Sequence, residues 1–251
     1  MAHFTIFRDE VATEDPAALF PSVSPRNSKL GNIPSFSTMP GRGFLMLNDG
    51  RAVVDVPGTC GAACAGCEAH CYAVRLAKFR RETAVSWARN TAIVRAGDFE
   101  RLKRAILAHI ELNDRDYFRF HVAGELEDAA QFFAYCEIAE ARPLVRFALY
   151  THRFGDVVAW SDARGGTPSN LLINASLDNR PPTTEETAAA REVNARFFVC
   201  DVCDSGENPA LDAFPRCAAV DRDGMSTGIH CDACRACYTG APGSVTVCAK
   251  H

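Results

Sequence analysis

The fold is decided by two apolar runs separated by a helical segment. The first run is Leu144-Val-Arg-Phe-Ala-Leu-Tyr-Thr151 and the second is Leu171-Leu-Ile-Asn-Ala-Ser-Leu177. The segment 154–163 between them is expected to be a helix that stops at Gly165-Gly166. A buried strand, a helix and another buried strand are typical of a unit whose two strands run parallel.

The same alternation continues in both directions from this unit. Further strands are expected at residues 52–56, 118–123 and 197–202, with a candidate sixth at 244–248. Helices are expected at residues 72–96, from 98 onward, and at 128–141 and 183–195. About six mostly parallel strands predict an α/β fold, a partial or open (β/α) barrel. A flat doubly wound sheet is the alternative, because the alternation does not reveal the order of the strands.

Length and composition indicate one domain with a sizeable core. The chain has 251 residues, of which 47% are hydrophobic and 23% charged, and its formal net charge is -4. We expect an irregular N-terminal arm over residues 1–50, a β/α core with a first cysteine group over 51–205, and a cysteine-rich segment over 206–251 that completes the same domain. The charge balance gives no strong nucleic-acid signal.

The cysteine content indicates metal binding. No segment is apolar enough to cross a membrane, and residues 1–10 lack the pattern of a signal peptide, so we expect a cytoplasmic protein. In a reducing cytosol, 12 cysteines are more typical of metal ligands than of a disulfide framework.

The first cysteine group stands in a short loop after the expected strand 52–56. Its members are Cys60, Cys64, Cys67 and Cys71. Glycine and alanine fill the gaps, which lets the loop fold tightly around a compact centre with backbone amides near the sulfurs. We predict an iron–sulfur cluster here, and a zinc knuckle made from the same thiolates is the alternative. The basic residues that follow would offset the cluster's charge or form a solvated helix face: Arg75, Lys78, Arg80 and Arg81.

The second group has a spacing typical of a cubane cluster. It consists of Cys217 and the run Cys231-Asp-Ala-Cys234-Arg-Ala-Cys237. Zinc usually binds pairs of cysteines separated by a longer loop, and a zinc-bound structural clip is the alternative. We therefore predict two iron–sulfur clusters of the [4Fe–4S] type.

Other cysteines and histidines carry weaker signals. Cys136 lies on the apolar stripe of its helix and is expected to be a buried core thiol. Cys200 and Cys203 form either a redox-active pair or a spare pair at a strand end. His70 and His230 stand beside ligand cysteines, either as hydrogen-bond donors to them or as exposed loop residues.

Polar residues follow the expected strands at the ends where parallel β/α folds carry their chemistry. Glu125 follows the second strand, His152 the third and Asp178 the fourth. Because these ends meet at one edge of the sheet, we expect the three side chains to line a pocket as candidate catalytic residues. His121, within a strand, is expected to be a satisfied core residue.

Several segments together resemble the actinobacteriophage gene product 88 family. They are Asn27-Ser-Lys-Leu-Gly-Asn-Ile-Pro-Ser-Phe-Ser37, Cys60…Cys67-x-x-x-Cys71-Tyr72-Ala73, Phe118-Arg-Phe-His-Val-Ala-Gly-Glu125, Tyr150-Thr151 and Cys217…Cys231-x-x-Cys234-x-x-Cys237-Tyr238. The resemblance covers most of the chain from about Asn27 onward. It implies a phage or prophage origin, and hence the host cell cytoplasm, but no particular chemistry.

The first cysteine loop is also similar, more distantly, to the signature of radical S-adenosylmethionine (SAM) proteins. Cys60-x-x-x-Cys64-x-x-Cys67 has their spacing, and Gly124-Glu125 looks like the Gly-Gly-Glu that holds the SAM amino group. The resemblance implies an open iron in the first cluster, SAM bound by Gly124 and Glu125, and an auxiliary second cluster. Gly66 stands where those loops carry an aromatic residue, and Cys71 at the start of its helix is expected to close the first cluster.

Three functional hypotheses follow. The first is a non-catalytic iron–sulfur protein with a redox, electron-transfer or regulatory role, whose partner is an unidentified small molecule or host protein. The second is a radical SAM-like enzyme acting on a small molecule or nucleotide. The third is a zinc-stabilised binding module. Metal analysis separates the third from the others, and the number of protein ligands on the first cluster separates the first two.

Overall fold

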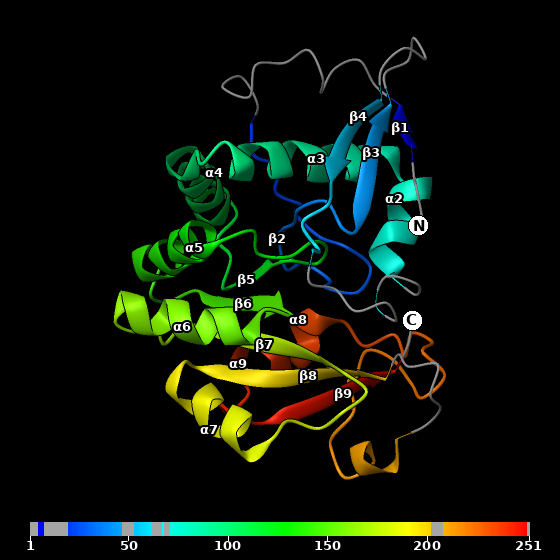
Figure 1. Cartoon of the computed structure of the whole chain (residues 1–251), viewed down its shortest axis with the longest axis vertical. Helices are drawn as coiled ribbons and strands as arrows, with labels where there is room; N and C mark the ends of the chain where they lie inside the picture. Colours follow the sequence, from blue (N-terminus) through cyan, green and yellow to red (C-terminus); the bar gives the residue numbers. More distant parts are fainter. Residues whose placement is uncertain are drawn as a thin grey trace.

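The computed structural model describes residues 5–7, 20–46, 53–61, 67, 71–201 and 208–249. It contains a six-stranded sheet and a three-stranded sheet (Figure 1). The larger sheet has the order β2-β5-β6-β7-β8-β9, and every neighbouring pair in it is parallel. The predicted α/β fold is confirmed as an open, all-parallel sheet that does not close into a complete barrel.

The strands differ between the two sheets in length and direction. Those of the larger sheet are β2 (Ser35–Phe36), β5 (Tyr117–Phe120), β6 (Arg146–Thr151), β7 (Leu171–Asp178), β8 (Ala195–Asp201) and β9 (Val245–Ala249). The smaller sheet consists of β1 (Thr5–Phe7), β3 (Arg42–Met46) and β4 (Val53–Pro57), with β3 and β4 antiparallel. The candidate sixth strand near the C-terminus is confirmed as β9.

Several of the longer helices begin at a capping side chain. The longer ones are α2 (Tyr72–Phe79), α3 (Arg81–Arg95), α4 (Phe99–Leu112), α5 (Ala129–Ala141), α6 (Phe154–Arg164) and α7 (Thr184–Glu192). The Asp98 carboxylate accepts from the Arg101 N–H, and Thr183 and Glu186 form a reciprocal capping box at α7. A 3-10 turn (Pro209–Leu211) and the short helices α8 (Cys231–Cys234) and α9 (Ala236–Thr239) follow β8.

Three expectations are corrected. Strand 52–56 is not the first strand of the parallel sheet, because β4 pairs antiparallel with β3 in the smaller sheet. The N-terminal arm is not wholly irregular, because β2 pairs with β5 at the sheet edge. The single helix expected over 72–96 is two helices, since Arg80 leaves the helical conformation with φ -118° and ψ 80°.

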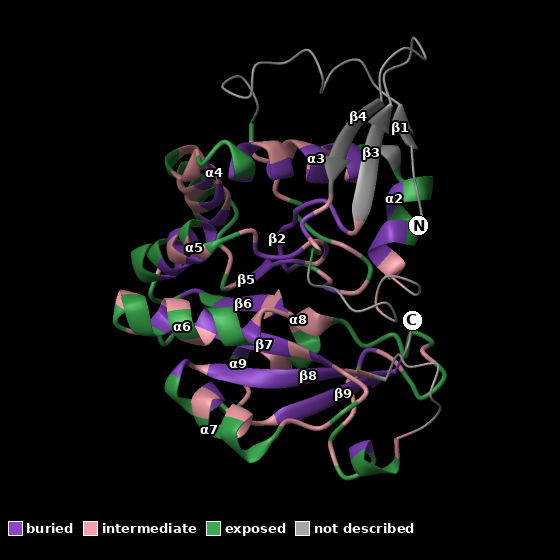
Figure 2. Cartoon of the chain, viewed as in Figure 1, coloured by how far each residue is buried: buried purple, intermediate pink, exposed green. Residues whose placement is uncertain are grey.

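The two faces of the larger sheet differ because side chains alternate along a strand. One face carries apolar residues such as Phe147, Leu149 and Val199, which belong to the largest core together with residues of α4, α5 and α6. The other face, the inner face, carries the alternate residues: Arg119 on β5, Tyr150 on β6, Ser176 and Asp178 on β7, Phe198 and Cys200 on β8, and Thr246 and Cys248 on β9. Strands β6, β7 and β8 are largely buried, whereas α5 and α6 expose their outward sides (Figure 2).

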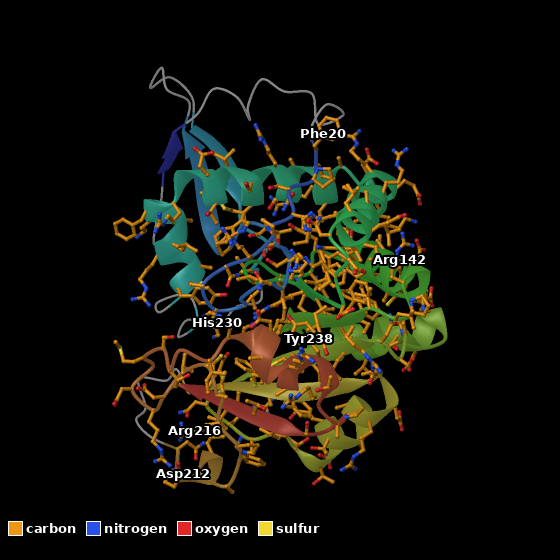
Figure 3. The ribbon with its side chains drawn as sticks, turned by 180° about the vertical axis from the view of Figure 1, so that it is seen from behind. Phe20, Arg142, Asp212, Arg216, His230 and Tyr238 are labelled. Atoms are coloured by element: carbon orange, nitrogen blue, oxygen red, sulfur yellow. The ribbon has the colours of Figure 1, made fainter. Side chains whose placement is uncertain are left out.

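Different segments cover the two faces. In Figure 1, α6 and α7 lie in front of the sheet. Seen from behind in Figure 3, α8 and α9 lie in front instead. The Tyr238 ring of α9 packs there with Leu30 and Ile33 of the arm and meets Tyr117 edge-on, with ring centroids 5.3 Å apart. The arm and the C-terminal cysteine segment therefore cover the inner face together.

Candidate cysteine-lined site

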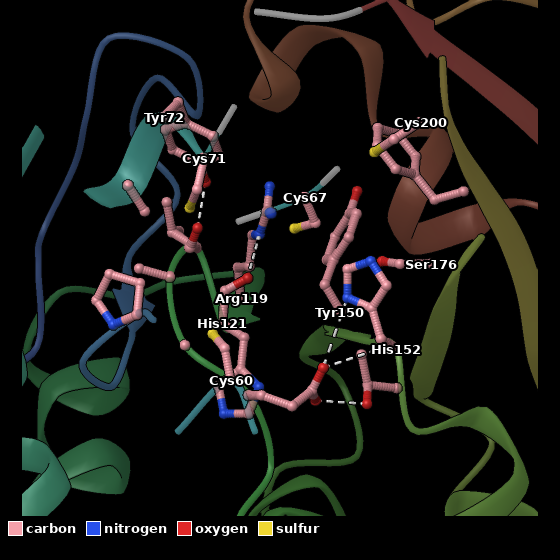
Figure 4. A pocket seen from close by; sticks show the side chains of 18 of the residues that line it. Cys60, Cys67, Cys71, Tyr72, Arg119, His121, Tyr150, His152, Ser176 and Cys200 are labelled. Atoms are coloured by element: carbon pink, nitrogen blue, oxygen red, sulfur yellow. Dashed lines mark hydrogen bonds and ion pairs between the residues drawn. The ribbon is translucent and has the colours of Figure 1, made fainter. Parts of the chain in front are cut away.

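A cavity of about 180 Å³ lies against the inner face. Seven cysteines of the described residues line it: Cys60, Cys67 and Cys71 of the first group, Cys217, Cys231 and Cys237 of the second, and Cys200 of β8. Figure 4 shows the sulfurs of Cys60, Cys67, Cys71 and Cys200 around one space. Nothing in the sequence spacing indicated that the two groups would meet, and the parallel sheet brings them together.

The first group approaches the cavity from the end of β4 and the start of α2. Thr59 anchors the loop, since its N–H donates to the Met39 carbonyl at 2.8 Å. Cys71 directly precedes α2 in an extended conformation, and the Tyr72 hydroxyl donates to the Val122 carbonyl, two residues beyond β5. These contacts hold the two ends of the loop against the inner face. Cys64 and His70 lie outside the described residues.

The arm holds the second group in place. The N–H of Cys231 donates to the Lys29 carbonyl at 2.9 Å, and the Asn32 N–H donates to the Asp232 carboxylate at 2.9 Å. Gly31 has a φ of +68°, and a Cβ atom there would lie 2.2 Å from Asp232 Oδ2. Only glycine therefore lets the arm approach the cysteine segment this closely.

The four cysteines of the second group differ in their position relative to the cavity. Cys217, Cys231 and Cys237 line the cavity, whereas Cys234 is exposed and is not among the lining residues. Strand β7 of the sheet also contacts this segment, because the Asn174 side-chain amide donates to the Cys237 carbonyl at 3.0 Å. The three predicted ligands that line the cavity are thus held in place through hydrogen bonds to their backbone.

The three candidate catalytic side chains meet at one end of the cavity. His152 Nδ1 lies 3.7 Å from Glu125 Oε2, and its Nε2 lies 3.6 Å from Asp178 Oδ1. Burial of the ring opposes protonation, but the two nearby carboxylates, Asp178 and Glu125, outweigh it and raise the pKa of His152 to about 9. At neutral pH an imidazolium therefore stands between two carboxylates. Their catalytic roles stay predictions.

The Glu125 carboxylate already accepts three hydrogen bonds. They come from Thr151 Oγ1 at 2.5 Å, the His152 N–H at 2.7 Å and the Leu126 N–H at 2.8 Å. Burial of the carboxyl group opposes ionisation, but the hydrogen bonds of His152 and Thr151 and the charge of His121 lower the pKa of Glu125. The side chain therefore joins the ends of β5 and β6.

Gly124, the other residue predicted to hold SAM, has a packing role. It has a φ of +78°, and a Cβ atom at this position would lie 2.1 Å from Thr38 Oγ1. Glycine is thus required by the close approach of the arm. A role in cofactor binding remains a prediction.

Sequence reasoning missed Arg119. Its side chain is only 9% exposed and lines the cavity, with the guanidinium carbon 3.8 Å from the centre of the Tyr150 ring. Its Nε donates to the His121 carbonyl at 3.3 Å. No carboxylate of the described residues forms an ion pair with it. The available signal was an arginine at an alternate position within an apolar strand.

The remaining candidates from the sequence analysis are divided between buried and exposed positions. Cys136 is fully buried in the apolar core, as predicted. His121 is buried as predicted, with Nε2 3.1 Å from the Tyr135 hydroxyl, although it also borders the cavity. His230 is exposed, as are Arg75, Lys78 and Arg80, while Cys203 lies outside the described residues.

The described part of the chain holds no group of three or more histidine, cysteine, aspartate or glutamate side chains that could bind a single metal ion. The lining cysteines therefore surround the cavity without converging on one point. Among the described residues, no helix is long and apolar enough to span a bilayer.

The comparisons with known proteins identify the family. The family described as Gene product 88 matches residues 22–240. The chain belongs to the gene product 88 family. This confirms the resemblance that the sequence segments indicated, and the matched residues include both predicted cysteine groups. Strand β9, with Cys248, lies beyond them. No curated protein and no solved structure matches the chain.

Proposed function

We propose that this gene product 88 protein is a cytoplasmic iron–sulfur protein whose two clusters lie side by side in the cavity, with a redox, electron-transfer or regulatory role. The observation that carries the proposal is that cysteines from both groups line one cavity. Two clusters that share a cavity wall can exchange electrons with each other. A small molecule or a host protein would be the external redox partner.

The shape of the site is compatible with clusters. Thiolates around one zinc ion all lie about 2.3 Å from the same point. The four thiolates of a cubane cluster bind four different irons, so their sulfurs stand around a larger centre. Cysteines distributed over the wall of a cavity of about 180 Å³ fit the second arrangement.

The charge of the wall is also compatible. A cluster held by thiolates is anionic, and hydrogen bonds and neighbouring charges set its potential. Arg119, which stays protonated in proteins, is buried in the wall and no described carboxylate pairs with it. A bound cluster would supply the negative charge that this buried cation otherwise lacks. Lys29 also lines the cavity.

Anaerobic purification tests the proposal. We expect brown protein with roughly eight irons and as many acid-labile sulfides per chain, the content of two [4Fe–4S] clusters. Cys67→Ala should lose about half of the iron, whereas Cys136→Ala, which changes a thiol in the apolar core, should keep all of it. Colourless protein that contains zinc would establish the zinc-stabilised binding module instead.

A radical SAM-like enzyme is the second candidate. It is favoured by the placement of Cys60 and Cys67, two of the three cysteines of the SAM-like signature, in the same cavity as His152 and Asp178. If Cys71 does not bind the cluster, the three signature thiolates leave one iron of a cubane free. Addition of SAM to the reduced protein tests this. A SAM-induced change in the electron paramagnetic resonance (EPR) spectrum would support the enzyme. An unchanged spectrum in both the unmodified protein and Cys71→Ala would exclude a SAM site.

A further inference from the structure

Three cysteines stand in one row across the carboxyl ends of neighbouring strands. Cys200 of β8 is the register partner of Cys248 of β9. On the other side of β9, Arg216 pairs with Val247 in a parallel bridge, and the Cys217 N–H donates to the Val247 carbonyl at 2.7 Å. Cys217 therefore lies beside Cys248, one residue further along. Strands are about 4.8 Å apart, and partners in register point to the same face.

Cys248 differs from an ordinary core thiol. Its side chain lies on the inner face, because Val245 and Val247 occupy the apolar face. Its sulfur shares a hydrogen bond with the sulfur of Cys217, which lines the cavity, although Cys248 itself is not a lining residue. Cys136 is equally buried, at 0% exposure, but lies entirely within the apolar core. The two cysteines thus share their burial and differ in their surroundings.

Cys234 is placed in the opposite way. It belongs to the Cys-x-x-Cys-x-x-Cys run, yet it is exposed and is not part of the cavity wall. Its neighbours in the run, Cys231 and Cys237, both reach the cavity. Cys217 therefore connects Cys248, its neighbour on β9, to the part of the cavity that Cys217 lines together with Cys231 and Cys237.

We propose that Cys248 is the fourth ligand of the second cluster, together with Cys217, Cys231 and Cys237, and that Cys234 is not a ligand. This inference rests on the proposed iron–sulfur function. When iron binds, the S–H bond of Cys248 breaks, its proton leaves to water, and an iron–thiolate bond forms. The hydrogen bond between the two sulfurs is lost at the same time, and each sulfur binds its own iron. Strand β9 then joins the cluster to the sheet.

The test compares three cysteine variants of the full chain, each reconstituted anaerobically with ferrous iron and sulfide. Cys248→Ala should lose about half of the iron and acid-labile sulfide, because one of two clusters is lost. Cys234→Ala should keep the content of the unmodified protein. Cys136→Ala is the matched control for loss of a fully buried thiol and should also keep both clusters. A Cys248→Ser variant should alter the EPR signal of one cluster only, since oxygen replaces sulfur on one iron.

The outcomes separate this inference from the proposed function. Loss of half of the iron in Cys234→Ala, whatever Cys248→Ala does, would overturn the ligand assignment and leave the iron–sulfur function standing. Full iron content in Cys248→Ala, or an unchanged EPR spectrum in Cys248→Ser, would also overturn it. Absence of iron from the reconstituted unmodified protein would overturn both. If Cys248→Ala does not fold, the Cys234→Ala and Cys248→Ser results still decide.

Discussion

The two faces of the parallel sheet belong to the same strands but carry different kinds of side chain. On β6, Phe147 and Leu149 enter the apolar core, while Tyr150, which follows Leu149, faces the cavity and stacks on Arg119. On β8, Val199 is in the core and Cys200 lines the cavity. Helices seal the first face, whereas the arm and the cysteine segment cover the second. One face therefore stabilises the fold, and the other is available for chemistry.

The largest expected difference between the faces is in stability. Phe147 is fully buried between Phe118 and Phe120, so Phe147→Ala should lower the free energy of unfolding by about 3–5 kcal/mol through lost burial and a residual cavity. On the inner face, Ser176→Ala should change it by only about 0.5 kcal/mol, since a half-buried hydroxyl beside a cavity packs little. Urea unfolding of both metal-free variants measures the two effects. Equal losses would show that the inner face also contributes to the stabilising core.

The apolar face could be predicted from the sequence because its signals are local. Runs such as 144–151 and 171–177 predicted the strands that became β6 and β7, and the helices expected from 98 onward and over 128–141 are confirmed as α4 and α5. The same strand ends led to Glu125, His152 and Asp178, which do meet in one cavity. The alternation of apolar residues depends only on neighbours in sequence. Predictions of strands and helices that are based on it therefore agree with the structure.

The inner face could not be predicted in the same way, because its contacts depend on strand order. Cys200, Cys217 and Cys248 become neighbours only once β8, β9 and the 215–217 segment lie side by side. Strand β2 has two residues, too short for any periodic signal. The position of β4 depends on pairing with β3, which the sequence reasoning assigned to an irregular arm. Spacing revealed which cysteines belong to a loop, but not that two loops share a cavity.

A second difference concerns charge, and Arg119 tests it. A buried cation near an anionic cluster favours the reduced form, which carries one more negative charge. Arg119→Met should therefore lower the midpoint potential of the nearer cluster. At an effective dielectric constant of about 20 and a separation of about 6–8 Å, the loss is roughly 2–3 kcal/mol, on the order of 100 mV.

Redox titration followed by EPR measures this shift. Arg75→Met is the matched control, because Arg75 is exposed on α2, and solvent should screen its charge almost completely. Equal potentials in the unmodified protein and Arg119→Met would show that Arg119 does not balance the cluster charge. An equal shift in Arg75→Met would show that the potential responds to net charge rather than to the wall of the cavity.

The smallest expected difference is the pH dependence of stability at the charged end of the cavity. The pKa of His152 is raised from 6.5 to about 9 in the folded protein, since Asp178 and Glu125 outweigh the opposing effect of burial. A raised pKa means that the folded state binds more protons than the unfolded state between these values. The stabilisation is therefore complete below pH 6.5 and is lost as the pH rises through about 9.

His152→Gln should remove this contribution because a neutral amide cannot form the two ion pairs. The free energy of unfolding of the metal-free unmodified protein should exceed that of His152→Gln by about 1–2 kcal/mol more at pH 6 than at pH 9.5. This is less than the full shift implies, since the side chain is 24% exposed and water screens its charge. The comparison cancels the titration of the cysteines, which both proteins share. His230→Gln, which alters an exposed loop histidine, should run parallel to the unmodified protein. Parallel curves for His152→Gln as well would mean that His152 is not held as an imidazolium between Glu125 and Asp178.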